Sequence, residues 1–167
     1  MELVTNDISA ICMHTNLDAA EGGVNDILAQ KLGLRDLKPL TDEKIGRVGT
    51  LKCEIPLVEF THFVIKSLGC NGLRYTDCGK PVHRVAVGGG ACGDYIPQAI
   101  AAGCDTFVTS DLRYHEFLDN TELNLIDAGH FYTENPVTRV LADTLKNAFP
   151  DISVKISETH TDCMKYA

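Results

Sequence analysis

Between residues 82 and 109 the sequence contains a strand, a glycine-rich turn, a helix and a second strand in close succession. The apolar run V-H-R-V-A-V at 82–87 is typical of a buried strand, and T-F-V-T at 106–109 is typical of another. Gly88–Gly93 predicts a turn after the first strand, and residues 95–102 predict a helix. Because two strands joined through a helix pair in parallel, this unit predicts an α/β fold.

Strands and helices continue to alternate over the rest of the chain. Apolar runs predict further strands at 8–13, 45–51, 123–126 and 152–157, and residues 34–44 are expected to form a loop. Apolar residues at helical spacing predict helices at 24–32, 56–68, 113–118 and 137–148. We therefore expect a mixed, largely parallel sheet flanked by helices, in a single region that spans residues 1–167.

Charge and cysteine content exclude several classes of partner. Fifteen basic and 23 acidic residues give a formal net charge of -8, which repels nucleic-acid phosphates and anionic membranes. The seven cysteines are odd in number and include no C-x-x-C pair, which is typical of reduced thiols. Residues 1–7 lack the features of a signal peptide, and no early apolar run approaches the roughly 20 residues of a membrane helix. We expect a soluble, cytoplasmic protein without nucleic-acid or membrane partners.

Three polar clusters follow expected strands or precede expected helices. They are H-T-N-L-D at 14–18, S-D-L-R-Y-H-E at 110–116 and D-A-G-H-F-Y-T-E at 127–134. Parallel sheets bind ligands beyond the carboxyl ends of their strands, so we expect the functional site among these clusters.

Two of these clusters contain candidate metal ligands. His130 and Glu134 lie four residues apart near the start of the last long helix, a spacing that can turn both side chains to one side. The pair can instead serve helix capping or surface ion pairs. Asp18, with Asn16 and His14, supplies oxygen and nitrogen donors that divalent ions prefer. The alternatives are that Asp18 caps the following helix and that His14 is a hydrogen-bonded structural residue.

The third cluster offers a proton carrier. His115 lies in it beside Asp111 and Glu116, and an imidazole can exchange protons near neutral pH. The alternative is a solvated helix face. Arg113 could contact an anionic substrate or pair with Asp111.

The glycine turn also has two interpretations. Gly88-x-Gly90-x-x-Gly93 follows a predicted strand and has Asp111 about 20 residues further on, as in the dinucleotide fingerprint. However, too few residues flank it for two mononucleotide-binding halves, and a tight strand-to-helix turn is the alternative. Cys92, at the expected helix start, has no adjacent histidine and is expected to be a packing residue.

The ordered combination of three segments carries a family resemblance. M-H-T-N-L-D-A-A-E-G-G-V-N-D at 13–26, T-S-D-L-R-Y-H-E-F at 109–117 and L-I-D-A-G-H-F-Y-T-E at 125–134 together resemble the Nif-three-like, or YbgI-like, family. Some of its members are labelled GTP cyclohydrolase I type 2 homologs. The resemblance implies an α/β fold, a ring-like homohexamer and two divalent metal ions per subunit. It implies that Asp18, His130 and Glu134 are metal ligands, and that His14 and His115 line the same cavity.

The chain departs from the family pattern at its beginning. The family uses two adjacent histidines in an S-H-H-P-type segment well before the H-T-N-L-D motif, and this chain has no His-His pair. We therefore expect the first strands of the family fold and two metal ligands to be missing. The remaining ligands would hold one ion, or none, with zinc, manganese or iron as candidates. The short connection between Leu68 and Val82 leaves no room for the inserted domain of larger members.

These expectations lead to a metal-dependent, hydrolase-like protein. Asp18, His130 and Glu134 would hold a divalent ion that activates water, and His115 or His14 would move protons. The family label suggests a small purine nucleotide as the substrate. A noncatalytic metal-handling or interaction protein is the alternative, and nucleotide binding at the glycine turn without metal chemistry is a third hypothesis. Apolar surface exposed by the missing strands would favour self-association.

Overall fold

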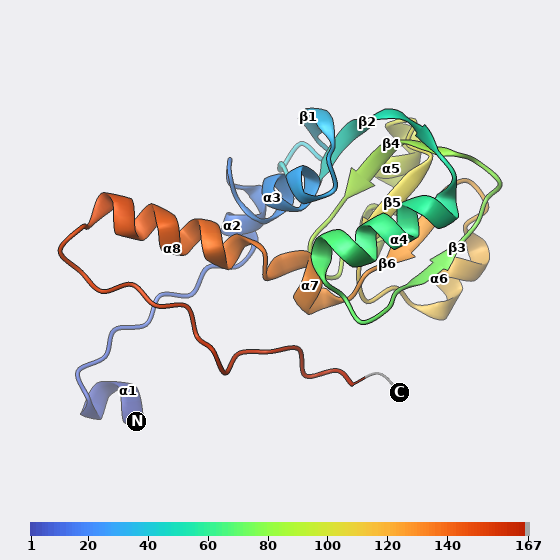
Figure 1. Ribbon diagram of the computed structural model, residues 1–167. Coiled ribbons are helices and arrows are strands. Elements are labelled where there is room, and N and C mark those ends of the chain that lie inside the picture. The colour runs from blue at the N-terminus through green and yellow to red at the C-terminus, as the bar shows by residue number, and fades with distance from the viewer. Residues whose placement is uncertain (166–167) are drawn as a thin grey trace.

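The computed structural model describes residues 1–165 and has a six-stranded sheet with helices on both faces (Figure 1). The strands lie in the order β1-β2-β4-β5-β6-β3. Their bounds are β1 Arg35–Pro39, β2 Arg47–Ile55, β3 Arg74–Thr76, β4 Val82–Val87, β5 Thr106–Thr109 and β6 Asn124–Asp127. The helices are α1 Glu2–Thr5, α2 Thr15–Ala19, α3 Val24–Lys31, α4 Leu57–Leu68, the 3-10 turn η1 Gly93–Tyr95, α5 Ile96–Ala101, α6 Tyr114–Asp119, α7 His130–Glu134 and α8 Val137–Ala148.

The sheet is mixed, as expected, and its parallel part is confined to the three central strands. Strands β4, β5 and β6 pair in parallel. The pairs β1–β2, β2–β4 and β3–β6 are antiparallel. Parallel pairing is therefore a smaller share of the sheet than the sequence suggested. The three parallel strands still end at one edge, which is the edge where such sheets bind ligands.

Alternating side chains on the central strands build two apolar clusters, one on each face of the sheet. Val85 on β4 and Val108 on β5 belong to the cluster that α3 and α4 cover. Their neighbours Ala86 and Phe107 belong to the cluster on the face covered by α5. All four side chains are fully buried, so the central strands are hydrophobic on both faces.

The structure confirms most predicted elements and corrects others. Strands β4 and β5 have the predicted bounds, and helices α3, α4, α6 and α8 begin and end within one residue of theirs. The strands predicted at 8–13 and 152–157 are wrong, because both segments are irregular and mostly exposed. The predicted loop at 34–44 contains β1, and β3 was not predicted. A strand is stable only beside a partner, and no strand among residues 1–165 pairs with 8–13 or 152–157.

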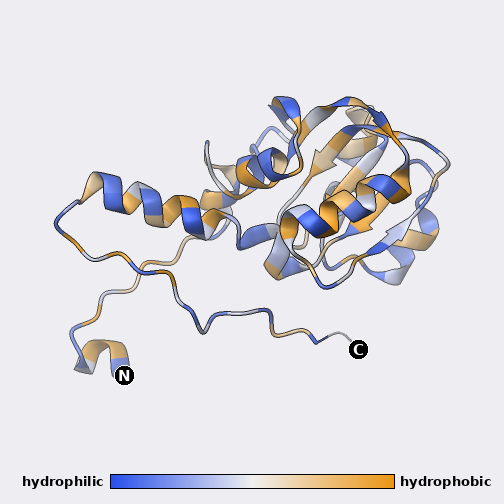
Figure 2. Cartoon of the chain, viewed as in Figure 1, coloured by the Kyte–Doolittle hydropathy of each residue, from blue (hydrophilic) through white to orange (hydrophobic). Residues whose placement is uncertain are grey.

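Helix α8 extends away from the sheet, and the chain before α2 and after α8 also leaves the main body (Figure 1). Figure 2 shows hydrophobic and hydrophilic bands that alternate along this helix. Only Val137 and Ala142 of α8 are buried, and Leu145 on the same helix is exposed. Phe149 and Ile152, which follow the helix, are also exposed. Apolar surface is therefore exposed on this part of the molecule.

Other predicted properties concern thiols and membranes. All seven cysteines carry free thiols. Among the described residues, no helix has both the length and the apolar character that crossing a membrane requires.

Buried hydrogen bonds around the glycine turn after β4 connect segments that are far apart in the sequence. The Asn25 side chain on α3 donates to the Asp18 carbonyl (3.0 Å) and accepts from the Gly89 N–H (2.9 Å). The Gly90 N–H donates to the hydroxyl of Thr133 on α7 (3.0 Å). Asn25 and Thr133 are almost completely buried. The turn therefore joins the segment of Asp18 to helix α7.

We predict that Asn25→Ala lowers the free energy of unfolding by about 2 to 6 kcal/mol, because it leaves the Asp18 carbonyl and the Gly89 N–H without this partner and each unsatisfied buried polar group costs about 1 to 3 kcal/mol. Urea unfolding followed by circular dichroism measures this loss. Asn6→Ala is the matched control, since Asn6 makes an exposed bond to the Glu2 carbonyl and its loss should cost no more than about 0.5 kcal/mol. Equal losses in the two variants would contradict the structural role of Asn25.

Candidate metal centre

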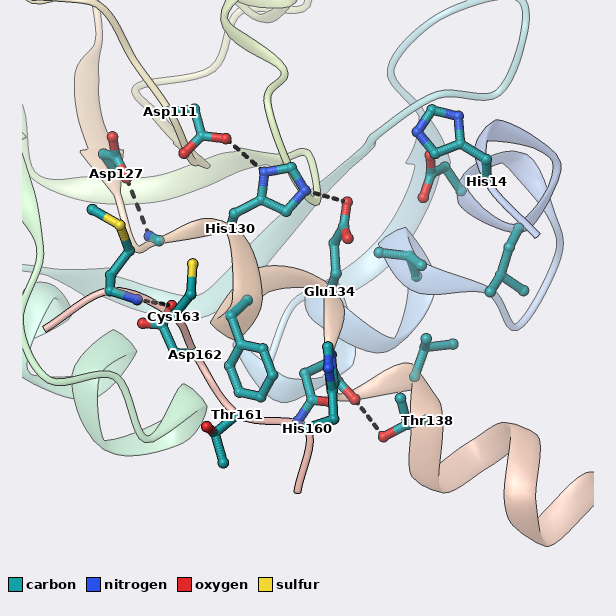
Figure 3. Close-up of a pocket in the computed structure, with 18 of the residues that line it drawn as sticks. His14, Asp111, Asp127, His130, Glu134, Thr138, His160, Thr161, Asp162 and Cys163 are labelled. Carbon is teal, nitrogen blue, oxygen red and sulfur yellow. Dashed lines mark hydrogen bonds and ion pairs between the residues drawn. The ribbon is translucent and has the colours of Figure 1, made fainter. Parts of the chain in front are cut away.

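The carboxyl ends of β5 and β6 carry the polar side chains of the site. Asp111 lies two residues after β5, and His130 begins α7 just after β6. A cavity of about 1480 Å³ opens at this edge of the sheet, and its walls include His14, Asp18, Asp111, His130 and Glu134. Figure 3 shows His130 between Asp111 and Glu134, with His14 beyond Glu134. The structure thus brings four of the five predicted site residues to one cavity.

His130 faces a carboxylate with each of its ring nitrogens (Figure 3). Nδ1 lies 2.6 Å from Asp111 Oδ2, and Nε2 lies 3.1 Å from Glu134 Oε1. A neutral imidazole has one N–H, so it can donate to only one of these two carboxylates. Both contacts become favourable if the ring carries a second proton or if a cation lies between Nε2 and Glu134.

Electrostatics at this cavity favour positive charge. Burial of the His130 ring opposes protonation, but the hydrogen bond to Asp111 and the charge of Glu134 outweigh it and raise the pKa of His130 above its ordinary value. Burial raises the pKa of Asp18, while the nearby His14 and His130 act in the opposite direction. A bound cation would stabilise the ionised carboxylate of Asp18 and so offset the cost of its burial.

The glycine turn leaves space for His130 and Glu134. Gly90 has a φ of +68°, and a Cβ atom there would collide with Glu134 Oε1 and lie 3.2 Å from His130 Nε2. A Cβ on Gly89 would lie 2.5 Å from a methyl group of Val24. The backbone of the turn therefore lies so close to these side chains that only glycine fits there.

The same turn is not available as a phosphate cradle. The Gly88 N–H donates to the Val108 carbonyl, and the Cys92 N–H donates to the Thr109 hydroxyl. The N–H groups of Gly89 and Gly90 are bound to Asn25 and Thr133 as described above. Since these four amides serve the fold, the structure favours the tight-turn interpretation over a dinucleotide site.

The remaining predicted site residues have the following places. His115 lies on the exposed face of α6, packs edge-on against the Tyr114 ring, and is not part of the cavity wall. In this structure α6 therefore turns the His115 side chain toward solvent and outside the residues that line the cavity. Arg113 pairs with Glu116 and Asp94 rather than with Asp111. The Arg113 interactions leave the Asp111 carboxylate to His130.

The structure also shows the surroundings of Asp18, His14 and Cys92. Asp18 lies inside α2, and Gly23 is the N-cap of α3, so Asp18 caps neither helix. His14 occupies the N-cap position of α2 without a side-chain cap bond, and its Nδ1 lies 3.1 Å from the Thr15 hydroxyl. Cys92 is buried, and burial raises the pKa of its thiol to about 11. Cys92 is therefore a packing residue, as expected.

Sequence reasoning gave no role in this site to three residues and one segment that contribute to it. Asp111 was considered only as the acidic residue of a dinucleotide fingerprint, a neighbour of His115 or a partner of Arg113, and its contact with His130 spans 19 residues of sequence. Asn25 and Thr133 lie within the quoted segments 13–26 and 125–134, but their residue types did not indicate a buried supporting role. The segment His160–Met164 also lines the cavity, and the His160 ring packs against Phe131 at 5.5 Å. The position of Asp111 after a parallel strand was the one available signal.

The donor set suits a divalent ion only in part. An imidazole and carboxylates are the donors that zinc, manganese and iron accept. Within residues 1–165, however, no three His, Cys, Asp or Glu side chains lie close enough together to hold one ion. His130 and Glu134 fit as two ligands, and Asp18 opens onto the same cavity without completing a three-ligand set.

Comparison with known proteins identifies relatives along almost the whole chain. Residues 1–163 match the family described as Duf34/NIF3 (NGG1p interacting factor 3). The chain is 32% identical over 176 residues to the GTP cyclohydrolase 1 type 2 homolog of Clostridium perfringens, which covers 99% of this chain and 67% of that protein. The homolog of Lactococcus lactis subsp. lactis is 34% identical over 166 residues, covering 95% of this chain and 63% of that protein.

A solved structure shows the same fold. The hypothetical protein SA1388 of Staphylococcus aureus matches with a TM-score of 0.89 at 25% identity, covering 99% of this chain and 71% of that one. This chain spans about two thirds of the length of these relatives. The resemblance predicted from the three motifs is confirmed, and the chain belongs to the Duf34/NIF3 family.

Proposed function

We propose that this chain binds a divalent metal ion between His130 and Glu134 and acts as a metal-dependent hydrolase. The observation that carries the proposal is the placement of one imidazole between two carboxylates, 2.6 and 3.1 Å away. A neutral ring can donate a hydrogen bond to only one of the two carboxylates. Replacing the proton on Nε2 by a divalent ion would resolve this conflict and use Glu134 as a second ligand.

Each residue has a separate role in this proposal. His130 and Glu134 would hold the ion, and Asp18, which lines the same cavity, would have to move closer to serve as a third ligand. A divalent ion in such a site lowers the pKa of a coordinated water to near neutral. His14, which lines the same cavity, accepts and returns protons. Zinc, manganese and iron all accept these donors.

We propose a nucleotide-like substrate on the basis of the relatives named GTP cyclohydrolase 1 type 2 homologs. The cavity wall is acidic at Asp18, Asp111 and Glu134. The cationic Arg74 in the same wall is already paired with Asp127 and the Leu112 carbonyl. A phosphate group would therefore be repelled by this wall unless a cation is bound first.

A noncatalytic role in metal handling or protein interaction is the alternative. It is favoured by the absence of a three-ligand cluster among residues 1–165. The exposed apolar side chains on and after α8, which include Leu145 and Phe149, favour self-association into a homo-oligomer such as the family's hexamer. The free thiols suit the reducing cytoplasm, where we place the protein.

Metal content tests the binding half of the proposal. After dialysis against zinc or manganese and then buffer, the wild-type chain should retain metal, and His130→Ala should lose it because Nε2 is a ligand. Elemental analysis against protein concentration measures the ratio. His62→Ala is the matched control, since His62 is an exposed histidine on α4. Equal metal in the wild type and His130→Ala would contradict the assignment.

Turnover tests the catalytic half. With manganese or zinc added, we expect conversion of GTP, monitored by chromatography of the nucleotide, and Asp18→Ala should slow it by about 100-fold or more. This scale follows from losing several kcal/mol of charge stabilisation at about 1.4 kcal/mol per factor of ten. A wild type that binds metal without turning over GTP or a related purine nucleotide would instead support the noncatalytic alternative.

A further inference from the structure

We propose that Asp111 is a positioning residue that fixes the tautomer and the ring orientation of His130. The inference rests on the proposed metal site, but its first consequence can be measured without any metal. A histidine that binds a metal through one ring nitrogen commonly donates its other N–H to a carboxylate, which fixes the ring and increases its basicity as a ligand. The Asp111 carboxylate is placed to accept that N–H.

The two contacts of His130 are unequal in length. The Asp111 contact, from Nδ1 to Oδ2, is 2.6 Å, slightly shorter than the roughly 2.7 to 2.9 Å of charge-assisted hydrogen bonds from nitrogen to oxygen. The Glu134 contact, from Nε2 to Oε1, is 3.1 Å. On this proposal the shorter contact holds the proton, on Nδ1, and the lone pair of Nε2 is directed at Glu134. This is the tautomer that can bind a cation beside Glu134.

The backbone on each side of Asp111 is fixed by the fold. The Ser110 N–H donates to the Gly90 carbonyl (3.1 Å), and the Leu112 N–H donates to Asp127 Oδ2 (3.0 Å). Ser110 and Leu112 are both buried. Asp111 lies between them with a φ of +54°, a left-handed conformation that Asp adopts more readily than most residues. This conformation directs the carboxylate to His130.

No cation competes for this carboxylate among the ion pairs of the described residues. Arg113, the nearest basic residue in the sequence, pairs with Glu116 and Asp94. Arg74 pairs with Asp127 at the end of β6. His130 is the partner that the structure gives to Asp111, so removing Asp111 should change the state of the ring without breaking another ion pair.

Two substitutions separate the hydrogen bond from the charge and the backbone. Asp111→Gly removes the acceptor and accommodates the positive φ without strain, whereas Asp111→Asn keeps an acceptor oxygen and also tolerates this conformation. Asp36→Gly is the matched control, because Asp36 is an exposed aspartate with a φ of +53° and does not line the cavity. Asp36→Gly removes the same charge as Asp111→Gly and gives the backbone the same added freedom.

The first measurement is the tautomer of His130 in metal-free protein, by nitrogen NMR at a pH where the ring is neutral. The His130 signals are assigned with His130→Gln. We expect the wild type, Asp111→Asn and Asp36→Gly to carry the proton on Nδ1. In Asp111→Gly the proton should move to Nε2, where it can donate to Glu134. The same Nε2–H tautomer in the wild type, or an unchanged tautomer in Asp111→Gly, would overturn the proposal.

The second measurement is zinc affinity by competition with a chelating dye. Asp111→Gly should bind zinc about 10- to 100-fold more weakly than the wild type, the range for lost partners of ligating histidines. Asp111→Asn should lose less, and Asp36→Gly should match the wild type. Equal affinity in Asp111→Gly and the wild type would overturn the role of Asp111. If the wild type bound no zinc, the proposed function would fail, while the tautomer would still decide the role of Asp111.

Discussion

A short series of buried hydrogen bonds through the turn after β4 holds the site together. Asn25 joins the backbone of Asp18 to Gly89, and Thr133 joins Gly90 to helix α7. These bonds connect a segment near the beginning of the chain to a helix near its end, across the edge of the parallel strands. Only a turn without side chains could pass this close to Glu134.

The site combines this rigid support with an excess of negative charge. Asp18, Asp111 and Glu134 face a cavity in which His130 is the central basic group. Burial raises the pKa of Asp18, whereas the nearby His14 and His130 lower it, so a positive charge in the cavity stabilises the ionised carboxylate of Asp18. A proton on His130 supplies one such charge, and a divalent ion beside Glu134 would supply more. The acidic net charge of the chain, which by itself indicated little about function, agrees with a site that attracts cations.

How much could be predicted from the sequence depended on whether the determining forces are local. The strands at 82–87 and 106–109 were correct because their apolar residues are buried on both faces, which gives a continuous signal. The segments 8–13 and 152–157 have a similar composition but no pairing partner, and pairing is a property of the whole fold. His130 and Glu134 were found because one helical turn joins them, whereas the contact of Asp111 with His130 depends on the register of β5 and β6. His115 belongs to the same polar cluster as Asp111, at 110–116, but the orientation of α6 points its side chain away from the cavity.

Anomalous X-ray scattering from crystals soaked in manganese or zinc is the sharpest test of the proposed cation between His130 and Glu134. We expect an anomalous peak within coordination distance of His130 Nε2 and a Glu134 oxygen, with Asp111 still bonded to Nδ1. Crystals that bind the ion elsewhere, or that show His130 bound through Nδ1 in place of Asp111, would contradict it.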